Sequence, residues 1–131
     1  MKFSIITVCF NSEKTIQNTL ESVWSQNFLD MEHIIIDGNS SDGTMEIVQS
    51  YSKKCNYPVI IKSECDQGIY DAMNKGLIIS SGNYVSFLNS DDIYASTDVL
   101  KKISQCDGMV EGKDILYGDV ILYDSSFHVV V

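Results

Sequence analysis

Two adjacent carboxylates, Asp91 and Asp92, follow a short apolar run in the stretch FLNSDD. Neighbouring carboxylates repel each other, so a cation beside them would stabilise the pair. Carboxylate oxygens are the ligands that Mg²⁺ and Mn²⁺ prefer, and Mg²⁺ commonly binds substrate phosphates as well. The pair therefore indicates a divalent-cation site, while a turn or a helix cap would use the same residues without any ligand.

Another carboxylate, Asp37, ends a β-branched run and precedes a glycine. Asp-Gly is a common hairpin pair, but a helical pattern follows here and disfavours a hairpin. A carboxylate in this position can accept hydrogen bonds from a base N–H or a ribose hydroxyl. The next residues, GNSSDGT at 38–44, lack the lysine of a phosphate-binding P-loop, so we exclude an NTPase and expect the glycines to serve backbone turns.

The stretch DQGIYDAMNKG, at residues 66–76, mixes core residues with polar ones. Asp71 and Asn74 are three residues apart and would share one face of a helix. Lys75 is one of few cations in this region, and it would either be an exposed lysine or touch a phosphate. Met73 is expected to belong to the core.

Apolar periodicity predicts the elements that position these side chains. Nearly continuous apolar runs predict strands over 3–10, 33–36, 59–61, 83–88, 114–123 and 127–131. Residues at helical spacing predict helices whose inward-facing side chains are Ile16, Leu20, Val23 and Trp24, then Met45, Val48 and Tyr51, then Ile69, Met73 and Leu77, and last Leu100 and Ile103. The expected cap residues are Asn11 or Ser12 for the first helix and Thr97 for the last.

Strand and helix alternate four times, which predicts an α/β fold with three α/β/α layers around a mainly parallel sheet. The length of 131 residues suits a single domain over residues 1–131. In such folds ligands bind beyond the carboxyl ends of the strands. The polar side chains expected at those ends are Asn11, Asp37, Glu64, Asp66, Asp91 and Asp92.

The overall composition excludes several classes of protein. With a net charge of −9, the chain would repel the phosphates of nucleic acid, so no nucleic-acid partner is expected. Four cysteines without a CxxC pair suit reduced thiols in a cytosolic protein, with Cys9 as a core residue. No apolar run is long enough for a membrane span, and the start lacks a signal-peptide cleavage site. His33 and His128 form no Ser-His-Asp or Cys-His arrangement, and we interpret His33 as structural.

Four stretches together resemble the N-terminal half of family 2 glycosyltransferases with the GT-A fold, a Rossmann-like fold of nucleotide-diphospho-sugar transferases. They are SIITVCFN, IIIDGNSSDGT, SECDQGIYDAMNKG and GNYVSFLNSDD, which occur in the family's order within residues 3–95. Four ordered motifs are far more specific than any one of them.

The resemblance implies a nucleotide-sugar donor and a Mg²⁺ or Mn²⁺ cofactor. It places Thr7, Val8 and Asn11 along the nucleoside pocket, Asp37 at the base, and Asp66 and Asn74 near the donor's nucleotide and sugar. Asp91 and Asp92 match the family's DxD-type acidic motif, in which one carboxylate contacts ribose or sugar and the other holds the metal; Asp92 is our choice for the metal. Asn89 departs from the aspartate that the family often has there, which puts the division of labour within the motif in question.

Family 2 enzymes invert the anomeric centre, and a carboxylate deprotonates the acceptor hydroxyl. In the family this base lies downstream of the acidic motif. We therefore expect the general base beyond Val131, and a chain that is the N-terminal part of a longer transferase and is slow or inactive alone. The implied acceptor is a glycan or a lipid-linked sugar, in a cytoplasmic protein that can serve a membrane-associated pathway such as polysaccharide biosynthesis.

Other α/β proteins fit less well. A phosphoacceptor receiver domain needs acidic residues after its first strand, where this chain has Phe10-Asn11-Ser12. A nucleotidyltransferase needs a basic triphosphate-binding loop near the N-terminus, which is absent from the sequence. A non-catalytic nucleotide-binding α/β module remains the alternative, and restoring downstream sequence would separate it from a transferase fragment.

Overall fold

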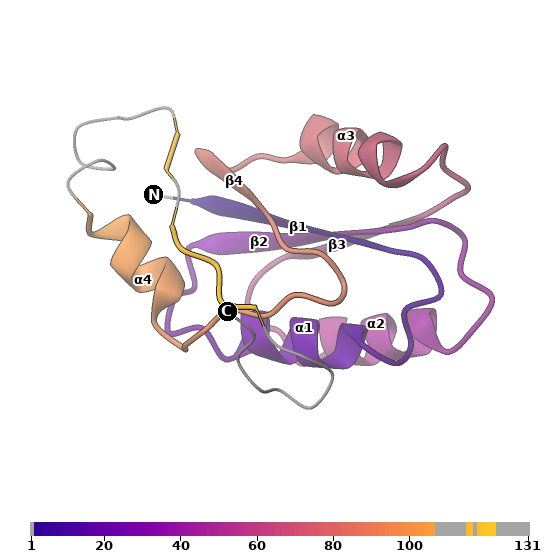
Figure 1. Ribbon diagram of the computed structural model, residues 1–131, viewed down its shortest axis with the longest axis horizontal. Coiled ribbons are helices and arrows are strands. Elements are labelled where there is room, and N and C mark those ends of the chain that lie inside the picture. The colour runs from indigo at the N-terminus through magenta and orange to yellow at the C-terminus, as the bar shows by residue number, and fades with distance from the viewer. Residues whose placement is uncertain (1, 107–114, 117, 123–131) are drawn as a thin grey trace.

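The computed structural model describes residues 2–106, 115, 116 and 118–122, which form a parallel sheet with helices on both faces (Figure 1). The elements are β1 (Phe3–Cys9), α1 (Ile16–Trp24), β2 (Met31–Asp37), α2 (Thr44–Ser52), β3 (Val59–Ser63), α3 (Ile69–Ile79), β4 (Tyr84–Phe87) and α4 (Val99–Ser104). The strand order is β3-β2-β1-β4, and each pairing in this sheet is parallel. Helices α1 and α2 lie on one face and α3 on the other, which confirms the predicted three-layer arrangement (Figure 1).

The central strands β1 and β2 are buried along their whole length, as continuous apolar runs predict. Their register aligns Cys9 with Asp37, and Asp37 with Ser63 at the end of β3. Three neighbouring strands therefore end at the same level, and the loops that follow them start side by side. Cys9 is a buried core thiol, and the four cysteines are free, as expected.

Helix α1 buries Ile16, Leu20 and Val23 but leaves Trp24 52% exposed, so the prediction of a buried Trp24 is wrong. At 100° per residue, Trp24 lies at the border of the apolar stripe rather than at its centre. The helix also has no side-chain cap. Instead, the backbone carbonyl of Ser12 accepts hydrogen bonds from the N–H groups of Thr15 and Ile16.

Helix α3 packs on the sheet through small residues, Ala72 and Gly76, and not through Ile69 and Leu77 as predicted. Ile69 is 49% and Leu77 48% exposed. A Cβ on Gly76 would lie only 2.6 Å from the Cγ2 atom of Ile6. The helix approaches the sheet so closely that long side chains are pushed to its flanks, although Met73 still packs against the core as expected.

This close approach predicts that Gly76→Val separates α3 from the sheet. Forcing extra methyl groups into a packed core should lower the free energy of unfolding by about 2 kcal/mol, measured by chemical denaturation. Ile78→Val is the matched control because it places the same side chain on the same helix, at a position that is 81% exposed. Equal unfolding curves for the two variants would contradict the packing described here.

The region after β4 departs from the sequence prediction. Helix α4 has Asp98 and not Thr97 at its N-cap position, and no side chain caps it. The described part of the predicted strand 114–123 forms no strand, and its Ile115 and Val120 are 81% and 80% exposed. Alternating apolar residues become a strand only beside a partner strand, and the described residues offer none there. The predicted strand 127–131 lies outside the described residues.

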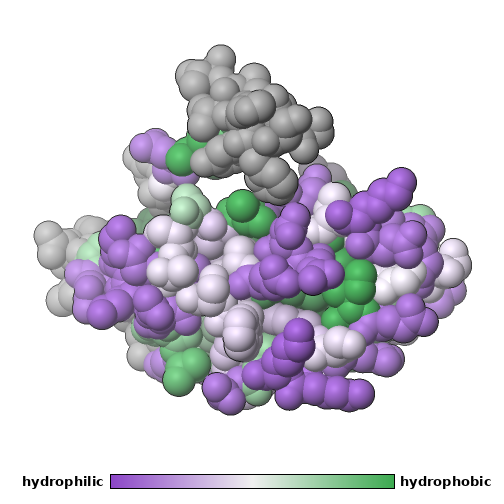
Figure 2. Space-filling view, turned by 90° about the horizontal axis from the view of Figure 1, so that it is seen from below, coloured by the Kyte–Doolittle hydropathy of each residue, from purple (hydrophilic) through white to green (hydrophobic). Residues whose placement is uncertain are grey.

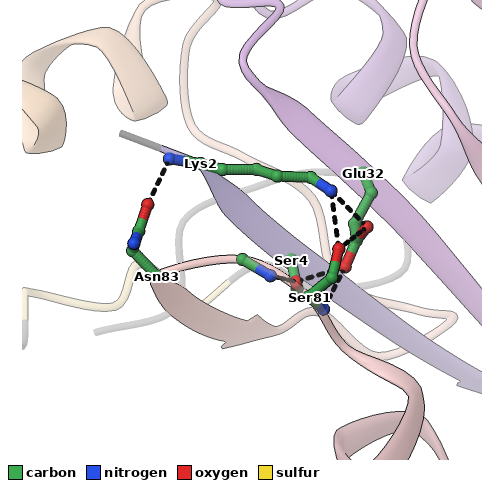
Figure 3. A network of polar contacts seen from close by, with 6 residues as sticks. Lys2, Ser4, Glu32, Ser81 and Asn83 are labelled. Atoms are coloured by element: carbon green, nitrogen blue, oxygen red, sulfur yellow. Dashed lines mark hydrogen bonds and ion pairs between the residues drawn. The ribbon is translucent and has the colours of Figure 1, made fainter.

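A buried carboxylate, Glu32, joins β2 to β1 and to the turn between α3 and β4 (Figure 3). It is 2% exposed and accepts hydrogen bonds from Ser4 Oγ, Ser81 N and Ser81 Oγ, each at 2.6 Å. The Nζ atom of Lys2 lies 2.7 Å from its Oε2 atom, and the Lys2 backbone N–H donates to Asn83. Burial raises the pKa of Glu32, but Lys2 and the two serines outweigh it and lower the pKa to about 2. Glu32 is therefore ionised and fully paired at neutral pH.

Candidate functional site

A pocket of about 670 Å³ lies beyond the carboxyl ends of the strands, where ligands bind in parallel α/β sheets. It is lined by Val8, Asn11, Ser12, Glu13, Lys14, Thr15, Asp42, Ile69, Asn89, Ser90 and Asp91. These residues come from the ends of β1 and β4, from the loop after β2 and from the start of α3. The pocket thus gathers residues far apart in sequence into one polar site.

A second hollow, of about 710 Å³, lies between α1 and α2 and contains none of the predicted site residues. Figure 2 views the molecule from the side of these two helices, where hydrophilic side chains surround smaller apolar areas. Trp24 and Tyr51 are among the residues that line this hollow. It lies on the helical face and not at the strand ends, so we place the functional site in the pocket of 670 Å³.

Asn11 joins the loops after β1 and β2, residues 10–15 and 38–43, which we call the loop pair. Its backbone N–H donates to Ser40 Oγ at 2.8 Å, and its Oδ1 atom accepts from the Ser41 N–H at 2.9 Å. Asn11 adopts a left-handed φ of 46°, and Asn39 one of 68°. Asparagine tolerates this backbone region better than most residues do, which explains its use at both turns.

Glu13 and Asp42 complete the loop pair. The Gly43 N–H donates to Glu13 Oε2 at 2.7 Å, and the Glu13 N–H donates to Asp42 Oδ2 at 3.2 Å. The Ser12 N–H donates to Thr44 Oγ1 at 2.8 Å. Gly43 lies in a turn, as predicted, but its φ of −75° is open to any residue. A Cβ on Gly43 would lie 2.9 Å from Glu13 Oε2, so the close approach of Glu13 favours glycine here.

Asp37 is fully buried and does not line the pocket. Its carboxylate accepts hydrogen bonds from the N–H and hydroxyl of Ser40 and from Ser63 Oγ at 2.6 Å. The thiol of Cys9 donates to it at 3.7 Å. Burial and the negative charge of Asp37 raise the pKa of this thiol to about 12, so it stays protonated and unreactive. Asp37 anchors Ser40, which in turn accepts a hydrogen bond from the loop after β1.

Thr7 points into the core, unlike its predicted pocket partners Val8 and Asn11, which line the pocket. Its Oγ1 atom lies 2.9 Å from His33 Nε2, and His33 Nδ1 lies 2.6 Å from the Tyr51 hydroxyl. Burial lowers the pKa of His33 to about 3, so the imidazole is neutral at physiological pH. The structural interpretation of His33 is confirmed.

Asp66 follows β3 and packs against the end of β2. Its Oδ1 atom accepts from the Gly68 N–H at 2.9 Å, and its Oδ2 atom lies 2.8 Å from the position that a Cβ would take on Gly38. Gly38 is therefore also a point of close approach. Asp66 and Asn74 do not line the pocket, whereas Ile69 between them does.

Asp91 lines the pocket, and Asp92 is exposed directly beside it. The turn that carries them is held from two sides. Ser90 Oγ lies 3.0 Å from Ser12 Oγ, and the Asn89 carbonyl accepts from the Asp92 N–H at 3.0 Å and from Thr19 Oγ1 at 3.4 Å. Two exposed carboxylates thus project from an anchored turn at the edge of the pocket.

The oxygen ligands at the edge of the pocket suit a cation that also binds the ligand in the pocket. Within the described part of the chain, no group of three or more His, Cys, Asp or Glu side chains could hold a metal ion by itself. Mg²⁺ is usually bound by one or two carboxylates together with waters and substrate phosphates, and Asp91 and Asp92 supply that number. The contact between Ser12 and Ser90 has no signal in the sequence. The pocket residues that sequence reasoning did not place at the site are Ser12, Glu13, Lys14, Thr15, Asp42, Ile69 and Ser90.

Comparisons with known proteins identify the family of this chain. A model of the family "Glycosyl transferase family 2" matches residues 4–126. A PGL/p-HBAD biosynthesis glycosyltransferase of Mycobacterium bovis (strain BCG / Pasteur 1173P2) is 34% identical over 125 residues, which cover 95% of this chain and 49% of the relative. The Escherichia coli protein WfaP, named as a UDP-Glc:alpha-D-GlcNAc-diphosphoundecaprenol beta-1,3-glucosyltransferase, is 36% identical over 100 residues, 76% of this chain and 39% of WfaP. The chain thus spans about half the length, or less, of these relatives.

Solved structures show the same fold. S. aureus TarS 1-349 in complex with UDP-GlcNAc superposes with a TM-score of 0.71 at 34% identity, over 79% of this chain and 30% of that one. The mannosyltransferase PcManGT from Pyrobaculum calidifontis, in complex with GDP-Man and Mn²⁺, has a TM-score of 0.70 at 22% identity over 75% of this chain and 30% of that one, a likeness of fold alone. The described residues contain no helix with the length and apolar character that crossing a membrane requires. From the family model and these relatives, the chain belongs to glycosyl transferase family 2 and has the GT-A fold.

Proposed function

We propose that residues 1–131 form the donor-binding domain of an inverting glycosyltransferase. It would use a nucleoside-diphosphate sugar and Mg²⁺ or Mn²⁺ to glycosylate a glycan or lipid-linked acceptor. The observation that carries this proposal is the position of Asp91 and Asp92, exposed on an anchored turn beside the polar pocket at the strand ends. The printed names of the relatives support the donor and acceptor classes, since TarS is seen with UDP-GlcNAc and WfaP is named for a diphosphoundecaprenol acceptor.

In this proposal the nucleoside lies along Val8 and Asn11. Asp37 and Asp66 stand behind the pocket, where they hold the loops around it. Thr7 contributes through the core by fixing β1. Asn74, exposed on α3, is proposed to reach the sugar.

Charge explains why a cation is needed. The chain carries a net charge of −9, and a nucleoside diphosphate adds about three more negative charges. Asp91 and Asp92 would hold the ion at the pocket edge, and their anchored turn would fix its position. When bound, the ion would stabilise the negative charge that develops on the leaving diphosphate.

Calorimetric titration tests the donor site directly. UDP, GDP and dTDP are titrated into the chain in Mn²⁺ and then in EDTA. One nucleotide, with UDP favoured by the TarS complexes, should bind in Mn²⁺ and lose at least about tenfold in affinity in EDTA. Uridine, which lacks the diphosphate, should bind equally weakly in both. Binding that ignores the metal, or no binding by a chain that still melts cooperatively, would contradict the proposal.

A further inference from the structure

Lys75, on the second turn of α3, is enclosed by three oxygen atoms. Its Nζ atom lies 3.0 Å from the Cys65 carbonyl oxygen, 3.1 Å from Glu64 Oε1 and 3.1 Å from Asp71 Oδ2. Its side chain is only 20% exposed. An ammonium group has three N–H donors, and three acceptors are in place for them. Lys75 is therefore neither the exposed lysine nor the phosphate ligand that the sequence suggested.

These contacts span the short loop between β3 and α3, residues 64–68, which we call the β3–α3 loop. Lys75 binds the start of the loop at Glu64 and Cys65. It also binds Asp71, whose Oδ2 atom accepts from the Gln67 N–H at 3.0 Å near the end of the loop. Gly68 closes the loop with a φ of 110°, a conformation that favours glycine. The ammonium group of Lys75 thus holds both ends of the five-residue β3–α3 loop.

The β3–α3 loop carries Asp66 and leads directly to Ile69. The Asp66 carboxylate touches Gly38 at the end of β2, and Ile69 lines the pocket. If the loop moved, the contact at Gly38 and the pocket wall at Ile69 would move with it. The placement of both residues therefore depends on the contacts of Lys75.

Lys75 also balances charge beside a pocket that is proposed to receive an anion. Hydrogen bonds from Lys75 and Lys62 hold the pKa of Glu64 below its usual range, and bonds from Gln67 and Lys75 do the same for Asp71. The contact with Asp71, followed by that with Glu64, raises the pKa of Lys75. All three groups are charged at neutral pH. Removing the lysine charge would leave Asp71 without a cationic partner, and Glu64 would keep only Lys62, whose Nζ atom lies 3.3 Å from Glu64 Oε1.

We infer that Lys75 is a positioning residue for the nucleotide-sugar donor: it holds the β3–α3 loop so that Ile69 lines the pocket and Asp66 stays against Gly38 behind it, without touching the ligand itself. This rests on the proposed function. In this inference Lys75 affects the affinity for the donor through Asp66 and the β3–α3 loop. A lysine that bound the phosphate directly would affect the affinity without depending on Asp66.

The test compares Lys75→Met, Lys75→Arg and the control Lys102→Met. Lys102, on α4, also forms an i,i+4 ion pair, with its Nζ atom 3.0 Å from the carboxylate of the N-cap residue Asp98, and it lines no part of the pocket. Lys75→Met should weaken UDP binding in Mn²⁺ by about tenfold, since small misplacements in a binding site are costly. It should also speed amide hydrogen exchange at Gln67 and Gly68. Lys75→Arg should restore most of the affinity, and Lys102→Met should leave both readouts unchanged.

A double-mutant cycle with Asp66→Asn separates positioning from direct contact. If Lys75 acts through Asp66, then Lys75→Met should cost little further affinity once Asp66→Asn is present, which is a strong coupling between the two sites. Additive losses, or wild-type affinity in Lys75→Met with a loosened loop, would overturn the inference and leave the donor site intact. Failure of the wild type to bind any of the three nucleotides would instead overturn the proposed function, and the inference with it.

Discussion

Replacing both Asp91 and Asp92 with asparagine is expected to abolish metal-dependent nucleotide binding while leaving the fold intact. Asparagine keeps the size of each side chain and the geometry of the turn, but removes the two negative charges that would hold the cation. Loss of even an outer-shell partner costs a metal site about 10–100-fold in affinity, so losing both carboxylates should weaken UDP binding in Mn²⁺ by at least about a hundredfold. The measurement is calorimetric titration of UDP in Mn²⁺ into the double variant.

The two single variants test which of the two aspartates binds the metal. The sequence favoured Asp92 as the metal ligand, whereas the structure has Asp91 lining the pocket. If Asp92 holds the metal, Asp92→Asn alone should remove the difference between Mn²⁺ and EDTA, and Asp91→Asn should weaken binding in both. Asp98→Asn is the control, an exposed carboxylate paired with Lys102 on α4. Metal-dependent binding by a cooperatively melting double variant would exclude this turn as the cation site.

Glu32→Gln is expected to destabilise the protein more than any surface substitution. The variant keeps an oxygen for Ser4 but turns an amide toward Lys2 and the Ser81 hydroxyl, which then lack their acceptor. The shift in the pKa of Glu32 from 4.5 to about 2 corresponds to about 3 kcal/mol of stability at neutral pH. For a chain of this length the melting temperature should fall by about 10 °C. Differential scanning calorimetry provides the measurement.

The pH dependence identifies the ionised carboxylate as the cause. Because the pKa of Glu32 is lower in the folded than in the unfolded chain, its contribution is complete above pH 4.5 and is lost as the pH falls towards 2. The stability difference between wild type and Glu32→Gln should shrink over that window. The buried His33 lowers the stability of both proteins below pH 6.5, so it cancels in the difference. Glu21→Gln, on the exposed side of α1, is the matched control, and a pH-independent difference would contradict this account.

The positions of β1 to β4 followed from the sequence because few physical solutions exist for a continuous apolar run, whereas the described part of the predicted strand 114–123 forms no strand. Asn11 and Asp91 were predicted at the site and line the pocket, since residues just beyond parallel strands meet at one edge; Val8, which the family resemblance implied, lines it as well. The family motifs added the expected ligand class, which strand patterns alone do not specify. The roles of these residues toward a donor remain predictions.

The errors arise where local patterns compete with packing. Ile69 and Leu77 have the spacing of a buried helix face, yet Ala72 and Gly76 occupy it because the backbone of α3 lies close to Ile6. Hydrophobicity alone would bury the long side chains, but the distance between α3 and the sheet determines which residues fit between them. The spacing of apolar residues in the sequence does not reveal that distance.

The burial of polar side chains could not be predicted from the sequence either. Asp37 was predicted to meet a ligand, and nothing in the sequence singled out Glu32. Both are buried and accept hydrogen bonds from serines far along the chain. Their partners Ser81 and Ser63 come from other elements, so only the folded topology brings them together. A single sequence carries no signal for such pairs.

The loop pair has a consequence for exchanging segments between relatives. Four hydrogen bonds join residues 10–15 to 38–43, and a fifth joins Ser12 to Thr44 at the start of α2. Each segment supplies acceptors for backbone N–H groups of the other. A chimera that takes only one segment from a relative would leave backbone N–H groups of the other segment without their hydrogen-bond acceptors. The two segments should therefore be exchanged together, although they are separate in the sequence.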